Sequence, residues 1–182
     1  MTNVIIDTKE FRNVGPYTLI TGILLLILGS VGIFLPGLMS LEIVLFIAAL
    51  LLIGGIFWAI HTYKNNPNSF IDWLKPVLLL ISGGLMLFYP TPGIAAIGLL
   101  LAIYLLLDAF GSFALAHAIH PLKGWGWMTF NGIASLVLAL LFLIGWPVTS
   151  LWLVGLYVGI SLFFDGWALI FLGWALRKGT QQ

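Results

Sequence analysis

The stretch that decides the fold is residues 76–107, PVLLLISGGLMLFYPTPGIAAIGLLLAIYLLL, which contains no Asp, Glu, Lys, Arg or His. Residues 13–41 and 124–164 form two similar uncharged runs. A helix that crosses a bilayer needs about 20 mostly apolar residues. The runs at 76–107 and 124–164 are therefore too long for one span each and must contain a turn. The sequence predicts an integral membrane protein whose first partner is the lipid bilayer.

The composition of the whole chain also indicates a membrane protein. Charged residues make up 7% of the 182 positions, whereas soluble domains carry about 25%. The net charge is only +1, and scattered cations cannot form the basic face that nucleic-acid binding requires. Cysteine is absent, which excludes disulfides, thiolate nucleophiles and cysteine metal sites. The polar start shows no small-residue cleavage site before the first apolar run, so we expect an uncleaved first span.

Three proline-containing breaks divide the long apolar runs: Leu35-Pro36-Gly37, Tyr89-Pro90-Thr91-Pro92-Gly93 and Trp146-Pro147-Val148-Thr149-Ser150. We interpret each break as the turn of a helical hairpin. The predicted spans are residues 17–35, 41–62, 73–89, 94–116, 125–146 and 151–176. The predicted fold is therefore all-α, a polytopic membrane bundle of six transmembrane helices.

Helix-start signals follow these breaks. Ser40 and Ser150 can cap the helices that follow them, and Thr91-Pro92 offers a cap followed by a proline at the first helical position. Ser69 with Asp72 fits a capping box. Because a proline lies at position 76, the third helix can instead begin near Lys75 or bend there.

The cations predict the orientation, because short cytoplasmic loops carry an excess of Lys and Arg. All seven fall on one predicted side: Lys9 and Arg12 before the first span, Lys64 and Lys75 after the second, Lys123 after the fourth, and Arg177 and Lys178 after the sixth. We therefore expect a multi-pass protein of a bacterial-type inner membrane, with a cytoplasmic N-terminal segment at residues 1–16 and a cytoplasmic tail at residues 177–182.

The three prolines also mark an internal repeat, because Pro36, Pro90 and Pro147 follow one another at nearly equal intervals. At the same distance after each proline a similar apolar segment recurs, with Gly54, Asp108 and Asp165 in equivalent positions. Because one hairpin cannot bury its small-residue faces alone, the copies should pack together. We predict three hairpin repeats, about 17–62, 73–116 and 125–176, in a single domain at residues 17–176.

This repeat is where the chain resembles a known family. Residues 22–29 (GILLLILG), 34–37 (FLPG) and 51–57 (LLIGGIF) are similar to the hairpin pattern of the HdeD family. Members of that family are small bacterial inner-membrane proteins with six spans, linked to acid resistance. The resemblance covers about residues 15–178 and implies the fold, the location and a role in stress. It implies no catalytic or ligand-binding residues.

Two aspartates and their expected neighbours form the candidate intramembrane polar site. Asp108 and Asp165 lie within predicted spans, where a charge costs about 2.5 to 3.5 kcal/mol on insertion scales and usually has a partner. By depth, Lys75 is the expected partner of Asp108, and Asn131 that of Asp165. These carboxylates either lock the hairpins together and reach interfacial water, or one of them takes up protons. Asp165 is the better candidate for proton uptake, because no lysine lies at its depth.

Small residues mark one face of the last predicted span: Gly155, Gly159, Gly166 and Gly173. This face is expected to pack helices within the bundle, and the alternative is self-association or contact with another membrane protein. His61, His117 and His120 lie at span ends, where they either sense acidification or are satisfied by water and headgroups. No third ligand has metal-site spacing, so we expect no metal.

No soluble-enzyme motif is present: the sequence contains no GxSxG, P-loop or HExxH pattern. We therefore expect no enzyme and no cofactor. The first interpretation is a non-enzymatic inner-membrane protein that supports acid or envelope stress resistance, which rests on the resemblance to the HdeD family. The first alternative is a channel or transporter for protons or small weak acids. The second is a scaffold that binds a partner protein through its glycine faces.

Overall fold

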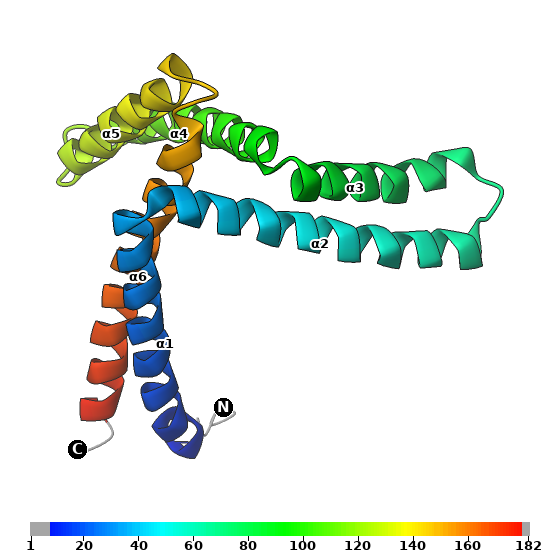
Figure 1. Ribbon diagram of the computed structural model, residues 1–182. Coiled ribbons are helices and arrows are strands. Elements are labelled where there is room, and N and C mark those ends of the chain that lie inside the picture. Colours follow the sequence, from blue (N-terminus) through cyan, green and yellow to red (C-terminus); the bar gives the residue numbers. More distant parts are fainter. Residues whose placement is uncertain (1–7, 180–182) are drawn as a thin grey trace. The chain divides into compact units, whose positions relative to one another are not determined.

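The computed structural model describes the backbone of residues 8–179 and the side chains of residues 16–176. Within that part the chain is all-α, with no strand (Figure 1). The helices are α1 (Thr8–Phe34), α2 (Pro36–Asn65), α3 (Phe70–Phe88), α4 (Pro90–Ile119), α5 (Trp125–Ile144) and α6 (Ser150–Gly179). All six are long and apolar enough to cross a membrane, so the chain is a multi-pass membrane protein. The side chains of Lys9, Arg12, Arg177 and Lys178, which helped to predict the cytoplasmic ends, lie outside the described residues.

The first two proline breaks leave only a single residue between helices. Leu35 alone separates α1 from α2, and Tyr89 alone separates α3 from α4. The Leu35 N–H donates to the Val31 carbonyl at 2.8 Å, and the Met39 N–H donates to the Leu35 carbonyl at 3.2 Å. Helical hydrogen bonding thus resumes at once on both sides of a proline that has no N–H to donate.

Consequently the predicted helix starts at Ser40 and at Thr91-Pro92 are wrong. Helix α2 begins at Pro36 and α4 at Pro90, because the fixed φ angle of proline suits the first helical position and its missing N–H costs nothing there. Ser40 therefore lies inside α2. The expected cap at Ser150 is also wrong, because its hydroxyl is buried without a hydrogen-bond partner.

The start of α3 confirms the predicted cap at Ser69 but not the reciprocal bond of a capping box, because the Ser69 N–H donates to the Asn66 carbonyl at 3.3 Å. The Ser69 hydroxyl accepts a hydrogen bond from the Asp72 N–H at 3.3 Å. Helix α3 begins at Phe70 and continues through Pro76, which is buried. The structure therefore excludes the alternative start near Lys75.

The chain divides into two compact units, residues 1–39 with 156–182 and residues 40–155. In the first unit α1 packs along α6 through glycines at matching intervals, Gly22 and Gly29 on α1 and Gly159 and Gly166 on α6. A Cβ atom added at Gly159 would lie 2.7 Å from the backbone carbonyl carbon of Gly32. Close backbone approach therefore holds this helix pair together, as is typical of small-residue interfaces in membranes.

In the second unit α2 packs along α3, and α4 packs along α5. Gly55 of α2 faces Leu80 of α3, and Gly132 of α5 faces the ring of Phe113 in α4. These two hairpins turn at residues 66–69, just after Lys64, and at residues 120–124, which include Lys123, and not at the predicted break around Pro90. An antiparallel helix pair needs a connection of about 2–5 residues, whereas Tyr89 alone separates α3 from α4.

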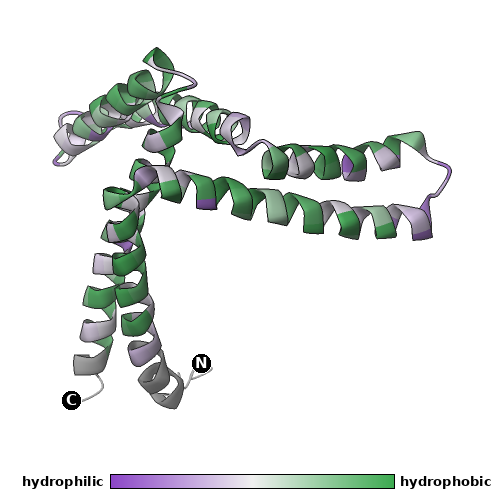
Figure 2. Ribbon diagram, viewed as in Figure 1, coloured by the Kyte–Doolittle hydropathy of each residue, from purple (hydrophilic) through white to green (hydrophobic). Residues whose placement is uncertain are grey.

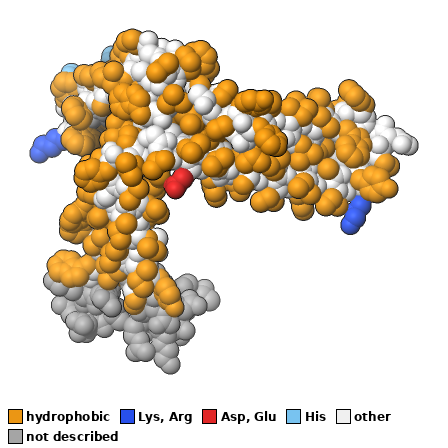
Figure 3. All heavy atoms as spheres, viewed as in Figure 1, with side chains coloured by type: hydrophobic (Ala, Val, Ile, Leu, Met, Phe, Trp, Pro, Cys, Tyr) orange, Lys and Arg blue, Asp and Glu red, His pale blue; other side chains and the backbone are white. Residues whose placement is uncertain are grey.

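Hydrophobic side chains dominate the visible surface (Figure 3), and large exposed apolar residues occur on all six helices. Hydrophilic residues gather in the loop between α2 and α3 (Figure 2). This distribution fits helices whose flanks contact lipid and whose connections contact water or headgroups. The packing of all six helices into a single domain of three hairpin repeats stays a prediction.

Candidate functional site

Four polar side chains meet between α4 and α5. The Ser135 hydroxyl donates to Oδ2 of Asp108 at 2.6 Å. The Asn131 amide donates to the same oxygen at 3.3 Å and to the Ser112 hydroxyl at 2.9 Å. Both serines are only 6% exposed. We call Asp108, Ser112, Asn131 and Ser135 the α4–α5 polar cluster.

Sequence spacing explains why the cluster forms. Asp108 and Ser112 are separated by one helical turn on α4, and Asn131 and Ser135 by one turn on α5, so each pair lies on one face of its helix. Asp108 lies well inside α4, about 27 Å from the end at Pro90 and about 17 Å from the end at Ile119. The cluster is therefore at membrane depth, where polar groups must satisfy one another.

The structure pairs the predicted site residues differently from the sequence analysis. Asn131 was expected to bond Asp165, but its amide donates to Asp108. Lys75 was expected to pair with Asp108, but its ammonium lies 3.2 Å from the centroid of the Trp58 ring. Both corrections have one cause, since the Asp108 face of α4 meets α5 whereas Lys75 on α3 faces α2. Asp165 is exposed on α6, and no described side chain donates a hydrogen bond to it.

Ser112 and Ser135 are the members of the cluster that the sequence analysis missed. Each lies one helical turn after a residue that was selected, Ser112 after Asp108 and Ser135 after Asn131. That spacing was the available signal, because residues at i and i+4 share a face. The spacing identifies Ser112 and Ser135 as members of the cluster only once α4 is known to pack along α5.

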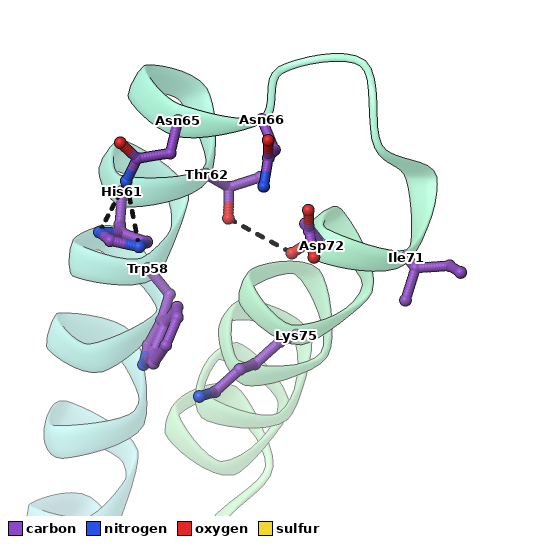
Figure 4. A pocket seen from close by; sticks show the side chains of 8 residues that line it. All are labelled: Trp58, His61, Thr62, Asn65, Asn66, Ile71, Asp72 and Lys75. Carbon is purple, nitrogen blue, oxygen red and sulfur yellow. Dashed lines mark hydrogen bonds between the residues drawn. The ribbon is translucent and has the colours of Figure 1, made fainter.

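A second polar site is a cavity of about 270 Å³ between the end of α2 and the start of α3 (Figure 4). Its lining residues are Trp58, His61, Thr62, Asn65, Asn66, Ile71, Asp72 and Lys75, and we call it the α2–α3 pocket. The Thr62 hydroxyl donates to the Asp72 backbone carbonyl at 3.3 Å, which ties the two helices together. Asn65 Nδ2 lies 3.1 Å from His61 Nε2.

The pocket also follows from helical spacing. Trp58, His61 and Asn65 follow one another at intervals of three and four positions on α2, so they line one face. The rings of Trp58 and His61 meet edge to face, with their centroids 5.4 Å apart. Lys75 reaches from α3 toward that face. His61 and Lys75 stand out separately in the sequence, but the pocket itself was not predictable from spacing alone, because it depends on the packing of α2 against α3.

Two serines are fully buried near the start of α6. The Ser40 hydroxyl accepts a hydrogen bond from the Gly155 N–H at 2.7 Å. Gly155, one of the glycines predicted to pack helices together, therefore contacts α2. The Ser150 hydroxyl has no hydrogen-bond partner and lies close to Gly98 of α4. Gly159, Gly166 and Gly173 of the same predicted face are also buried. At Gly159 and Gly166 this face packs on α1 within the chain.

The remaining histidines are separate from both sites. His117 is exposed near the end of α4, and the His120 ring meets the edge of Trp125 with centroids 5.0 Å apart. Among the residues whose structure is described, no three His, Asp or Glu side chains form a group that could hold a metal ion.

Comparison with known families matches the chain twice, at residues 20–78 and 74–144, to the family described as "Short repeat of unknown function (DUF308)". The chain belongs to the DUF308 family. The second DUF308 match begins as far after the first as Pro90 lies after Pro36, so the internal repeat is confirmed for these two copies. The first DUF308 repeat contains the α2–α3 pocket and the second contains the α4–α5 polar cluster. No curated protein and no solved structure matches the chain.

Proposed function

We propose that this DUF308 protein is a non-enzymatic component of a bacterial inner membrane that helps the cell withstand acid or envelope stress. Membership in the DUF308 family and six membrane-length helices support the class of protein. The resemblance of residues 22–57 to the HdeD hairpin pattern supports the stress role. Lys64 in the last turn of α2 and Lys123 in the loop after α4 support cytoplasmic termini.

The α4–α5 polar cluster is the observation that carries the proposal. A deprotonated Asp108 accepts hydrogen bonds from both Ser135 and Asn131. A protonated carboxyl group carries a hydrogen that itself needs an acceptor, so proton uptake would change the contact between the two helices. Acid would thereby act on helix packing, without any catalysed reaction.

The same geometry gives less support to the two alternatives, a channel or transporter for protons or weak acids and a scaffold for a partner protein. The cluster extends over about one turn of each helix, or about 5 Å, whereas a proton path must cross a core about 30 Å thick. The glycine face of α6 is covered by α1 at Gly159 and Gly166, which leaves less of it for a partner protein.

Acid-survival assays of a deletion strain test the proposal. The strain is complemented with the wild-type gene or with Asp108→Asn, Asp165→Asn or Glu42→Gln, at equal membrane abundance. Asp108→Asn is expected to lower survival in acid while growth at neutral pH is unchanged. Glu42→Gln is the control, because Glu42 is an exposed carboxylate on α2 away from the cluster. Full survival with Asp108→Asn would show that the cluster does not carry the function, and a loss with Asp165→Asn alone would move the acid response to Asp165.

A further inference from the structure

The α2–α3 pocket lies at the depth of lipid headgroups. Continuous helix runs from Pro36 to Trp58, a length of about 33 Å, and the hydrocarbon core is about 30 Å thick. The neighbouring Trp73 donates its indole N–H to the Pro67 carbonyl at 3.0 Å, and tryptophan is enriched at the membrane–water interface. Any ligand of this pocket therefore has the headgroup layer as its nearest source.

The pocket is lined by one negative and one positive side chain, and these two do not form an ion pair with each other. Asp72 and Lys75 both line it from α3, one helical turn apart, and both are exposed. The Lys75 ammonium lies over the Trp58 ring at 3.2 Å and does not form an ion pair with a carboxylate of the described chain. One cation and one anion that are both available match a zwitterion. A purely anionic group would meet the repulsion of Asp72.

The remaining lining suits a small polar group with an apolar tail. His61, Asn65 and Asn66 add hydrogen-bonding groups on the α2 side. The volume of about 270 Å³ is below the range of about 300–1,000 Å³ that encloses drug-sized ligands, so it fits a headgroup. Ile71 lines the pocket and is 79% exposed, which provides an apolar exit for acyl chains toward the lipid.

We propose that the α2–α3 pocket binds the phosphoethanolamine headgroup of a membrane phospholipid. The phosphate binds Lys75 and the side-chain amides of Asn65 and Asn66, and the primary ammonium binds between Asp72 and the face of the Trp58 ring. When the phosphate binds, the Lys75 ammonium moves away from the Trp58 ring. The ammonium of the lipid headgroup then takes its place over the indole. This site goes beyond the proposed stress function and depends only on the membrane-spanning helices.

Lipid titration of the purified full-length protein in detergent tests the site, with native mass spectrometry as the measure of affinity. The probes are phosphatidylethanolamine, phosphatidylglycerol and phosphatidylcholine with the same acyl chains, together with soluble phosphoethanolamine and inorganic phosphate. Phosphatidylethanolamine is expected to bind most tightly, because its primary ammonium can both contact Asp72 and donate hydrogen bonds. Lys75→Gln is expected to weaken its binding about tenfold. Asp72→Asn is expected to remove its preference over phosphatidylglycerol.

Matched variants separate the site from general charge effects. Lys64→Gln removes a lysine at the same end of α2 that does not line the pocket, and Glu42→Gln removes a carboxylate at the other end. Both should bind lipid as the wild type does. Lys75→Arg keeps the charge and should keep binding even if Lys75→Gln lowers the melting temperature. Three results would each overturn the proposal. The first is tighter binding of phosphatidylglycerol than of phosphatidylethanolamine, and the second is an equal loss of affinity in Lys75→Gln and Lys64→Gln. The third is equal affinity for soluble phosphoethanolamine and for phosphatidylethanolamine.

Discussion

Ser135 of α5 donates a 2.6 Å hydrogen bond to Asp108 of α4. The bond joins two helices at a depth where water is scarce, and its acceptor is a carboxylate. Hydrogen bonds to charged groups are stronger than those between neutral groups. This contact therefore stabilises the packing of α4 on α5.

Replacement of Ser135 by alanine should lower the free energy of unfolding by about 1 kcal/mol, a value set by two known tendencies. Hydrogen bonds between membrane helices average about 0.6 kcal/mol, and a charged acceptor places this one above the average. Denaturant unfolding of the full chain in detergent measures the change. Thr129→Ala is the matched control, because the Thr129 hydroxyl donates only to the Trp125 carbonyl on its own helix. Equal losses for the two variants would contradict the assigned strength of the Ser135 bond.

The glycine contact between α1 and α6 predicts a second effect. An alanine at Gly159 would place its Cβ 2.7 Å from the Gly32 backbone, and backbone atoms cannot move aside as a flexible side chain does. Overpacking of this kind costs about 1–3 kcal/mol, so Gly159→Ala should lower the thermal midpoint of the protein. Gly111→Ala is the control, because nothing lies within 4 Å of a Cβ at that position. It should leave the midpoint unchanged or raise it, through the better helix propensity of alanine.

The six apolar helices could be predicted from the sequence because a single quantity, the length of uncharged chain, sets the number of spans. The starts of α2 and α4 could not. At Ser40 the sequence offered a good capping residue, but the proline one turn earlier already begins the helix. The two signals compete, and the energetic preference of proline for the first helical position decides between them.

Two members of the α4–α5 polar cluster, Asp108 and Asn131, were predictable from the sequence, but the contacts of the cluster were not. Asp108, Asn131 and Lys75 stand out as polar groups within apolar helices, and depth along a helix follows from its constant rise per residue. Depth does not say which face of a helix meets which neighbour. Asn131 therefore had the expected kind of partner, an aspartate, but the partner was Asp108 and not Asp165. Lys75 met an aromatic ring in place of a carboxylate.

The two buried serines near the start of α6 should respond to alanine in opposite directions. Ser40→Ala removes the acceptor of the Gly155 N–H and should destabilise the protein by about 1 kcal/mol. Ser150→Ala removes a buried hydroxyl that has no partner, so it should be neutral or stabilising, because the penalty for burying that group disappears. The two variants delete the same atom, which makes each the control of the other in a thermal unfolding series. A larger loss for Ser150→Ala than for Ser40→Ala would show that the Ser150 hydroxyl has a partner in the folded protein.

The orientation of the chain can be measured directly because it contains no cysteine. Single cysteines are introduced at three exposed positions, Asn68 in the α2–α3 loop, Lys123 in the α4–α5 loop and Val148 in the third proline break. Lys64 and Lys75 beside the first of these loops and Lys123 in the second favour the cytoplasm. A membrane-impermeant maleimide applied to intact cells should therefore label Val148→Cys alone, and permeabilised cells should yield labelling at all three positions. Labelling of Asn68→Cys but not Lys123→Cys in intact cells would place the two loops on opposite sides of the membrane and would rule out the predicted topology.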